Sequence, residues 1–183
     1  MAEKKYIYGF DLSTSKCGIA VLQDDNTLIH NEFLKFKNDS ALEERAFIFD
    51  TKIKNLFNLY PPHKIYVENP LVMFKANMSM AQTIAKLNIF FGMCTYILYN
   101  NSSISPMLVN VRSARTKLGI KADKDAWGKA SKKDRQRLTK KAVIDYIIKK
   151  FANFEYKETK QGNPAPGIDD KADAVVLALQ AFN

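Results

Sequence analysis

The chain has 183 residues, 46% of them hydrophobic and 26% charged, which is typical of one globular domain rather than of a disordered or fibrous protein. No apolar stretch approaches the roughly 20 residues that a membrane-spanning helix needs, and the first residues lack the cleavage pattern of a signal peptide. The two cysteines lack CxxC spacing and predict buried free thiols, so we expect a cytoplasmic protein that is neither secreted nor membrane-bound.

The net charge of +9 is concentrated in one segment. Residues 112–141 include twelve basic and three acidic side chains, an excess equal to the whole net charge. Such a concentration is typical of proteins that bind the phosphate backbone of nucleic acids, although a solvated helix face is the alternative. The basic residues that we expect to contact DNA are Arg112, Arg115, Lys117, Lys132, Lys133 and Arg135.

In chain order, the first third predicts strands. Tyr6–Leu12, Cys17–Gln23 and Leu28–Phe36 are rich in aromatic and branched residues and are separated by short polar turns. Short turns join antiparallel neighbours, so we expect an antiparallel meander.

Two helices and a strand follow. Ser40 and Glu43 form a capping-box pattern that opens a helix over Ser40–Leu59. Lys64–Asn69 predicts a short strand. Met80–Tyr99 predicts a helix whose apolar residues surround its axis, so it should be buried in the core or against a second subunit.

The last third predicts a strand over Met107–Val111, a helix opened by a capping box at Ser131, and a final helix ending at Phe182. Alternating strands and helices after a meander predict an α/β RNase H-like fold in a single domain over residues 1–183. We expect a mixed five-stranded sheet, in which the antiparallel meander is joined by parallel strands, with helices on both faces.

Four carboxylates lie at positions where a purely structural role is difficult to assign. Asp11 is inside the first strand, and Glu68 ends the fourth. Asp170 and Asp173 project from one face of the last helix, directly before the apolar run Ala174–Ala178. A buried, unpaired carboxylate is costly, so these side chains require cations, hydrogen bonds or solvent.

Carboxylates that converge from three segments repel one another, and hard divalent cations with oxygen ligands relieve this repulsion. We therefore expect Mg²⁺ or Mn²⁺, two ions per site, which would activate a water and stabilise the leaving oxygen of a phosphodiester. Only two histidines are present, which argues against zinc, and no small-molecule cofactor is expected.

Each acid also has a simpler explanation. Asp169 or Asp170 could be the N-cap of the last helix, with Asp169 favoured in that role. Asp11 could cap a turn through Ser13, and Glu68 could pair with a lysine.

Three motifs resemble the RuvC family of Holliday junction resolvases. Gly9-Phe10-Asp11 followed by Gly18-Ile19-Ala20-Val21 resembles the family's first strands, and Tyr66-Val67-Glu68 resembles its second acidic motif. Asp170-Lys171-Ala172-Asp173-Ala174 resembles the family's D-A-A-D-A motif. The chain departs from the pattern at Leu12-Ser13 and Cys17, and has extra residues over 121–133 and 154–166. Such divergence is typical of phage or viral members, which act in the cytoplasm of a bacterial host.

The resemblance implies that Asp11, Glu68, Asp170 and Asp173 are catalytic metal ligands. It also implies a lysine serving the active site, either Lys132 or Lys133, and a role in DNA recombination and repair. The substrate would be a four-way junction or other branched DNA, nicked symmetrically on two opposed strands by a homodimer.

The segment after Glu68 resembles the family's junction-contacting loop, and its apolar residues could wedge into an opened base step. Packing in the core is the alternative. The loop residues that we expect to contact DNA are Met73, Phe74, Lys75 and Asn77.

We expect the homodimer to form through the helix Met80–Tyr99, with Ile89, Phe90 and Met93 as candidate contacts.

Three other functions remain open. An actin-like ATPase or sugar kinase would have a similar first hairpin, but no Gly-rich adenosine motif and no second Asp-Gly phosphate loop is present. A nuclease-dead DNA-binding module would leave the carboxylates without a role. An RNase H proper would share the metal site and differ in substrate.

Overall fold

The protein is an α/β sandwich built on one mixed sheet, seen here in a computed structural model that describes residues 4–70, 78–122 and 131–182. The five strands are ordered β3-β2-β1-β4-β5. Their bounds are β1 Tyr6–Leu12, β2 Lys16–Gln23, β3 Leu28–Lys35, β4 Pro62–Glu68 and β5 Met107–Val109.

Strands β1, β2 and β3 are antiparallel neighbours, whereas β4 runs parallel to β1, and β5 runs parallel to β4. The mixed five-stranded sheet expected from the sequence is therefore confirmed.

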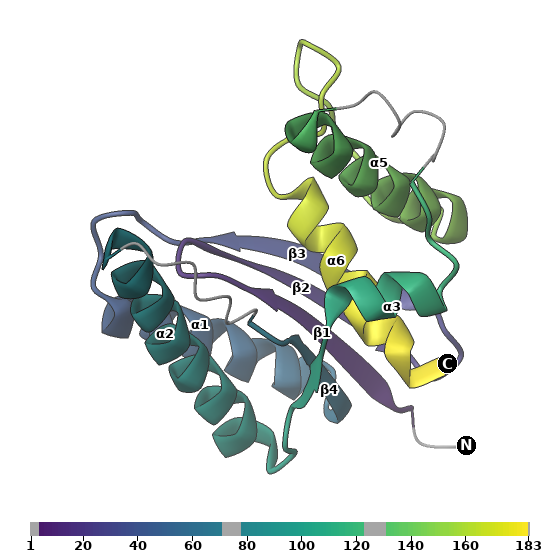
Figure 1. The fold of residues 1–183 in the computed structure, drawn as a ribbon. Helices are drawn as coiled ribbons and strands as arrows, with labels where there is room; N and C mark the ends of the chain where they lie inside the picture. Colours follow the sequence, from purple (N-terminus) through teal and green to yellow (C-terminus); the bar gives the residue numbers. More distant parts are fainter. Residues whose placement is uncertain (1–3, 71–77, 123–130, 183) are drawn as a thin grey trace.

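Helices cover both faces of the sheet, as Figure 1 shows, with α1 and α2 on one side and α3, α5 and α6 on the other. The described helices are α1 Leu42–Leu59, α2 Met78–Ser102, α3 Val111–Lys117, α5 Lys132–Lys150 and α6 Ile168–Ala178, followed by the 3-10 turn η1 Leu179–Phe182. Within the described residues, no helix is long and apolar enough to cross a membrane.

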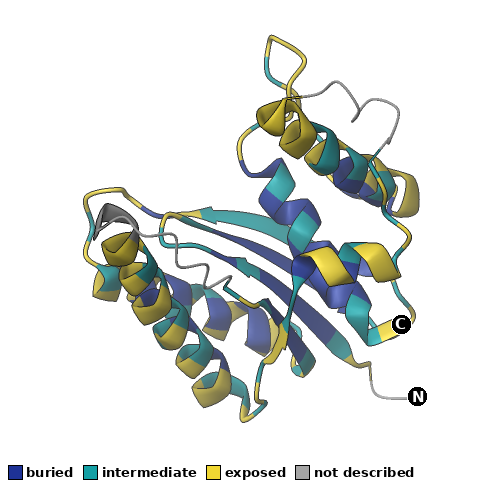
Figure 2. Ribbon diagram, viewed as in Figure 1, coloured by how far each residue is buried: buried dark blue, intermediate teal, exposed yellow. Residues whose placement is uncertain are grey.

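Each face of the sheet has its own hydrophobic core, because side chains alternate along the strands. Tyr8 and Phe10 of β1 point to the α1 and α2 side, where Phe10 packs edge-on against Phe49. Ile7 points to the α6 side, where the residues of α6 from Ala174 to Ala178 are fully buried. Figure 2 shows that the central strands and α6 are buried while the outer faces of α2 and α5 are exposed.

Two glycines let α6 lie directly on the sheet. A Cβ atom added to Gly9 would lie 2.0 Å from the carbonyl oxygen of Ala174, and one added to Gly18 would lie 2.1 Å from that of Asp170. No side chain fits in either place, so the helix backbone contacts the strand backbone. The start of α6 is thereby held against the end of the β1–β2 hairpin.

The meander is also tied to α1 by polar contacts. Glu32 of β3 interacts with His30 and forms an ion pair with Lys52 of α1. The hydrogen bond with His30 and the contact with Lys52, against a smaller opposing effect of burial, lower the pKa of Glu32.

Several predicted element boundaries are wrong by one to three residues, among them the start of α1 and the end of β5. Helix α1 begins at Leu42, and the backbone N–H of its N-cap Ala41 donates to the carboxylate of Glu44 at 3.3 Å, so the capping residues are one position later than predicted. The strand predicted over Met107–Val111 ends at Val109, because Asn110 caps the short helix α3, which the sequence analysis missed.

The predicted N-cap of the last helix is also wrong. Helix α6 begins at Ile168, after Gly167 in a left-handed conformation with φ of 89°. Asp169 and Asp170 therefore both lie in the first turn of the helix, where carboxylates interact favourably with the helix dipole.

Helix α2 is not buried on all sides. Phe90, Cys94 and Leu98 lie in the core, with Phe90 edge-on to Phe36, whereas Ile89 and Tyr96 are exposed. Phe90 was a candidate contact between subunits, and its burial excludes that role.

Candidate active site

Asp11 and Glu68 lie side by side at the carboxyl ends of two parallel strands. Phe10 of β1 pairs with Val67 of β4, so the next residue of each strand is one of the two acids. Because side chains alternate along a strand, both acids point to the face that α6 covers.

Helix α6 places two more carboxylates on this face. Asp170 and Asp173 are one turn apart, and the backbone of Asp170 rests on Gly18, the residue that pairs with Asp11 across the β1–β2 hairpin. The buried run after Asp173 fixes the helix, since each fully buried Val or Leu stabilises it by about 1.5–3 kcal/mol. The sheet and α6 thus bring together all four acids expected from the sequence.

Arg115 of α3 forms a strong ion pair with Asp173. Its Nη2 donates to both carboxylate oxygens at 2.6 Å, and its Nε donates to Oδ1 at 3.2 Å. Both side chains are largely shielded from solvent, with 17% and 13% exposed. Buried Val111 and Ala114 anchor α3, so that its arginine reaches α6.

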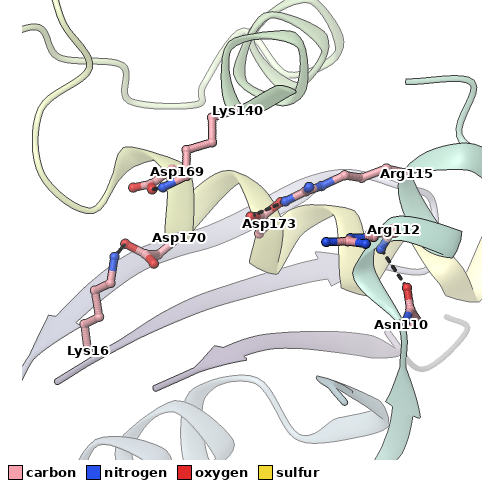
Figure 3. A network of polar contacts seen from close by, with 8 residues as sticks. All are labelled: Lys16, Asn110, Arg112, Arg115, Lys140, Asp169, Asp170 and Asp173. Atoms are coloured by element: carbon pink, nitrogen blue, oxygen red, sulfur yellow. Dashed lines mark hydrogen bonds and ion pairs between the residues drawn. The ribbon is translucent and has the colours of Figure 1, made fainter. Parts of the chain in front are cut away.

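Two lysines hold the first turn of α6, and Figure 3 shows these contacts together with the Arg115 pair. Lys16, which follows the turn after β1, donates to Asp170 at 2.6 Å. Lys140 of α5 forms an ion pair with Asp169. The three aspartates of α6 are therefore all paired with basic side chains from three different elements.

The turn that leads to Lys16 is itself held in place by a buried arginine. Arg45 of α1 donates to the carbonyl oxygen of Thr14 at 2.6 Å, and its other hydrogen bonds go to Asn38 and Ser40. Five guanidinium N–H groups allow one side chain to hold several backbone carbonyls at once.

The pKa values reflect the crowding of the acids. Burial, a hydrogen bond with Glu68 and repulsion by Glu68, Asp173 and Asp170 raise the pKa of Asp11 well above its usual range. Burial also raises the pKa of Asp173, although Arg115 opposes the shift. Burial raises the pKa of Asp170, against the effect of Lys16. The four acids therefore share one electrostatic environment, in which the anionic forms require compensation.

The chemistry of the donor set fits a hard divalent cation, because all four donors are carboxylates. In the arrangement described for residues 4–70, 78–122 and 131–182, no group of three or more acidic, histidine or cysteine side chains is placed so that it could hold a metal ion. Two of the four carboxylates are instead bound to Lys16 and Arg115. Ion pairs thus supply part of the compensation that the acids require.

Within the part of the chain that the structure describes, Glu68 and Asp11 do not have the simpler structural partners that their positions in the sequence suggested. None of the ion pairs among the described residues involves Glu68, so its expected lysine partner is not found there. The hydroxyl of Ser13 donates to the carbonyl oxygen of Lys16 rather than to Asp11, so this hydrogen bond closes the turn without the carboxylate.

The other expected site residues that the structure describes are basic side chains of α3 and α5. Lys132, Lys133 and Arg135 are exposed at the start of α5, and no hydrogen bond or ion pair to the four acids is found for Lys132 or Lys133 among the described residues. Arg112 and Lys117 are exposed on α3. The expected loop contacts Met73, Phe74, Lys75 and Asn77 lie outside the described residues.

Sequence reasoning missed the roles of Lys16 and Lys140, and assigned Arg115 only to DNA. Lys16 ends the polar turn after Asp11, which is a weak signal in retrospect. Lys140 and Arg115 are two of the twelve basic residues between 112 and 141, and no spacing distinguishes them from the rest.

No protein-family model and no curated protein matches the sequence. Solved structures do match. RuvC from Thermus thermophilus has a TM-score of 0.63 at 15% identity, over 97% of this chain and 93% of that chain. RuvC from the same organism in complex with a Holliday junction substrate has a TM-score of 0.61 at 16% identity, with the same coverage. The yeast mitochondrial Holliday junction resolvase Ydc2 has a TM-score of 0.50 at 16% identity, over 93% and 75% of the two chains.

At these identities the likeness concerns the fold. This chain has the RNase H-like fold of RuvC, as expected from its motifs, over nearly its full length.

Proposed function

We propose that this chain is a divalent-metal-dependent endonuclease that cuts branched DNA, with four-way junctions as its principal substrate. The observation that carries the proposal is the convergence of Asp11, Glu68, Asp170 and Asp173 from β1, β4 and α6 at one end of the sheet. A protein that only needed to fold would gain nothing from placing four mutually repelling carboxylates together.

The four carboxylates would hold Mg²⁺ or Mn²⁺, two ions per site, because hard cations prefer oxygen donors. When bound, such ions supply an activated water and neutralise the leaving oxygen of a phosphodiester. The protein's own contribution is position: Gly9 and Gly18 fix α6 against the sheet, so that acids from distant segments face one another.

The basic residues of α3 and α5, the helices that supply Arg115 and Lys140 to the aspartates of α6, would bind the phosphate backbone. Arg112, Lys117, Lys132 and Lys133 are exposed and can reach phosphates without losing other described partners, whereas Arg115 is engaged with Asp173. Phosphate contacts position a nuclease on DNA without selecting sequence. The structure of RuvC with a Holliday junction supports branched DNA as the substrate, as do the motifs shared with that family.

A homodimer would supply the two active sites that symmetric nicking requires. On α2 one exposed stripe consists of Ala85, Ile89, Gly92, Tyr96 and Tyr99, which recur every three or four residues. Three of these side chains are large and more than half exposed. A continuous apolar surface of this kind is typical of contacts between subunits.

Cleavage assays test the proposal directly. The purified protein is incubated with a labelled four-way junction, a duplex of matching sequence and an RNA–DNA hybrid, with Mg²⁺ and with EDTA. We expect paired cuts in the junction with Mg²⁺ only. Preferential cutting of the hybrid would indicate an RNase H, and ATP hydrolysis without any nuclease activity would favour the actin-like alternative.

Substitutions test the ligand assignment. Replacing Asp11, Asp170 or Asp173 with Asn, or Glu68 with Gln, should lower cleavage by orders of magnitude and leave junction binding largely intact. Asp145→Asn is the matched control, because this acid is exposed on α5. Parallel losses of binding and cleavage in all four variants would mean that the acids are needed for folding rather than for metal.

A further inference from the structure

The ion pair between Arg115 and Asp173 engages a carboxylate that the proposed function requires as a metal ligand. Both oxygens of Asp173 accept hydrogen bonds from the guanidinium group, three in all. A two-pronged contact of this kind is the strongest form of Arg–carboxylate pairing. Among the described ion pairs of the four acids, it is also the better shielded one, because the Lys16 side chain is 36% exposed and the Arg115 side chain 17%.

Charge compensation explains why this pair forms when no metal is bound. The site contains four acids, and two basic side chains, Lys16 and Arg115, contact them. Arg115 therefore reduces a repulsion that would otherwise oppose folding of α6 against the sheet.

The net charge of the site changes from negative to positive once two divalent ions bind. Two such ions bring as many positive charges as the four carboxylates have negative ones. A guanidinium that stayed on Asp173 would then be a surplus cation next to the ions, in a site shielded from solvent. The metal and Arg115 should therefore compete for the same oxygens.

The position of Arg115 allows it to leave without unfolding its helix. It lies in the last turn of α3, whose next residues Thr116 and Lys117 are exposed. Val111 and Ala114 are buried, and the Asn110 cap accepts two backbone hydrogen bonds, so the helix stays anchored while the side chain turns. Movement of one long side chain toward solvent is sufficient.

We propose that Arg115 is a positioning residue that takes the place of metal in the unloaded active site: it holds Asp173 until a divalent ion displaces it, and thereby sets the metal affinity. This inference rests on the proposed function, since it assumes that Asp173 is a metal ligand. Its consequence is that Arg115 stabilises the unloaded protein and weakens metal binding.

Metal binding and thermal unfolding test this without reference to cleavage. Mn²⁺ binding to Arg115→Gln and to the wild type is measured by isothermal titration calorimetry, and unfolding is followed in EDTA and in Mn²⁺. We expect Arg115→Gln to melt several degrees lower in EDTA, to bind Mn²⁺ about tenfold more tightly, and to gain more stability from Mn²⁺ than the wild type gains.

Two further variants separate the ion pair from general effects. Arg112→Gln removes the same charge from the same helix without touching Asp173, and should leave Mn²⁺ affinity nearly unchanged. Arg115→Lys keeps the charge but cannot make the two-pronged contact, so it should fold and bind Mn²⁺ with intermediate affinity.

The possible results are distinct. Unchanged or weaker Mn²⁺ binding by Arg115→Gln, with normal binding by the wild type, would overturn this inference and leave the proposed function standing. Equal tightening in Arg112→Gln would also overturn it, because only net charge would then matter. Failure of both the wild type and Arg115→Gln to bind Mn²⁺ would refute both proposals.

Discussion

Gly18→Ala is the substitution that most directly tests how the site is positioned. The added methyl carbon would lie 2.1 Å from the carbonyl oxygen of Asp170 and 2.5 Å from its carbonyl carbon. These are backbone atoms, so no side chain can rotate away. The first turn of α6 must therefore move by about 1 Å to restore van der Waals contact.

Both stability and activity should respond to this movement. Overpacking of this kind costs about 1–3 kcal/mol. For a protein of this size each kcal/mol lowers Tm by about 2–4 °C. A displacement of about 1 Å at catalytic groups lowers the rate by roughly 100-fold. We therefore expect Gly18→Ala to lose more in cleavage rate than its loss of stability explains, because Asp170 moves with the backbone.

The assay is thermal and urea unfolding combined with single-turnover cleavage of a junction. Gly92→Ala is the matched control, because the added Cβ would have no described atom within 4 Å apart from its own helix turn, and alanine favours a helix by about 1 kcal/mol. Because Gly92 lies on the stripe of α2 that we propose joins the subunits, the variants are compared at protein concentrations at which sedimentation shows the same assembly state for each. If Gly18→Ala unfolds and cleaves as Gly92→Ala does, the backbone contact between α6 and the sheet does not position the acids.

Three further predictions concern DNA binding, assembly and pH. If about six phosphates are neutralised, the logarithm of the junction binding constant should fall with the logarithm of salt concentration at a slope near −5. Replacing Lys132, Lys133 and Arg135 together with Gln should flatten that slope by about 2–3 units, and an unchanged slope would show that this end of α5 faces away from DNA. Sedimentation at micromolar concentration should give a dimer that Tyr96→Glu converts to a monomer; a wild-type monomer of 20.8 kDa would refute the proposed assembly. Because the pKa of Glu32 is lowered in the folded state, its contribution is present above the unfolded pKa of about 4.3 and is lost as pH falls through the folded value. Glu32→Gln should therefore cost about 1 kcal/mol at pH 7 and progressively less as pH falls through the folded pKa, and a loss that does not change with pH would contradict this sign.

The parts of the fold that follow from local patterns were predictable. The meander could be recognised from alternating apolar residues and short turns, and α6 from the apolar run after Asp173. The acids could be recognised because a carboxylate within a strand or before a buried run is unusual.

Three features of the structure could not be predicted: helix α3, the first residue of α1 and the basic partners of the acids. Helix α3 has seven residues, too few to show an amphipathic repeat. The start of α1 was predicted one residue too early, because Glu43 and Glu44 can each complete a capping box, one residue apart. The counter-cations were missed because charge pairing is set by tertiary structure: Lys16 and Asp170 are 154 positions apart in the chain.

That separation has a consequence for biogenesis. Strand β1 leaves the ribosome well before α6, and the acids of the two elements meet only when α6 docks on the sheet. Such long-range contacts form late, since their loop-closure entropy must be overcome first. A nascent chain that has already folded its meander and α1 would still lack three of the four carboxylates. If the proposed nuclease activity depends on all four carboxylates, it should therefore appear only when α6 docks, so that partly folded chains would not cut nearby nucleic acid.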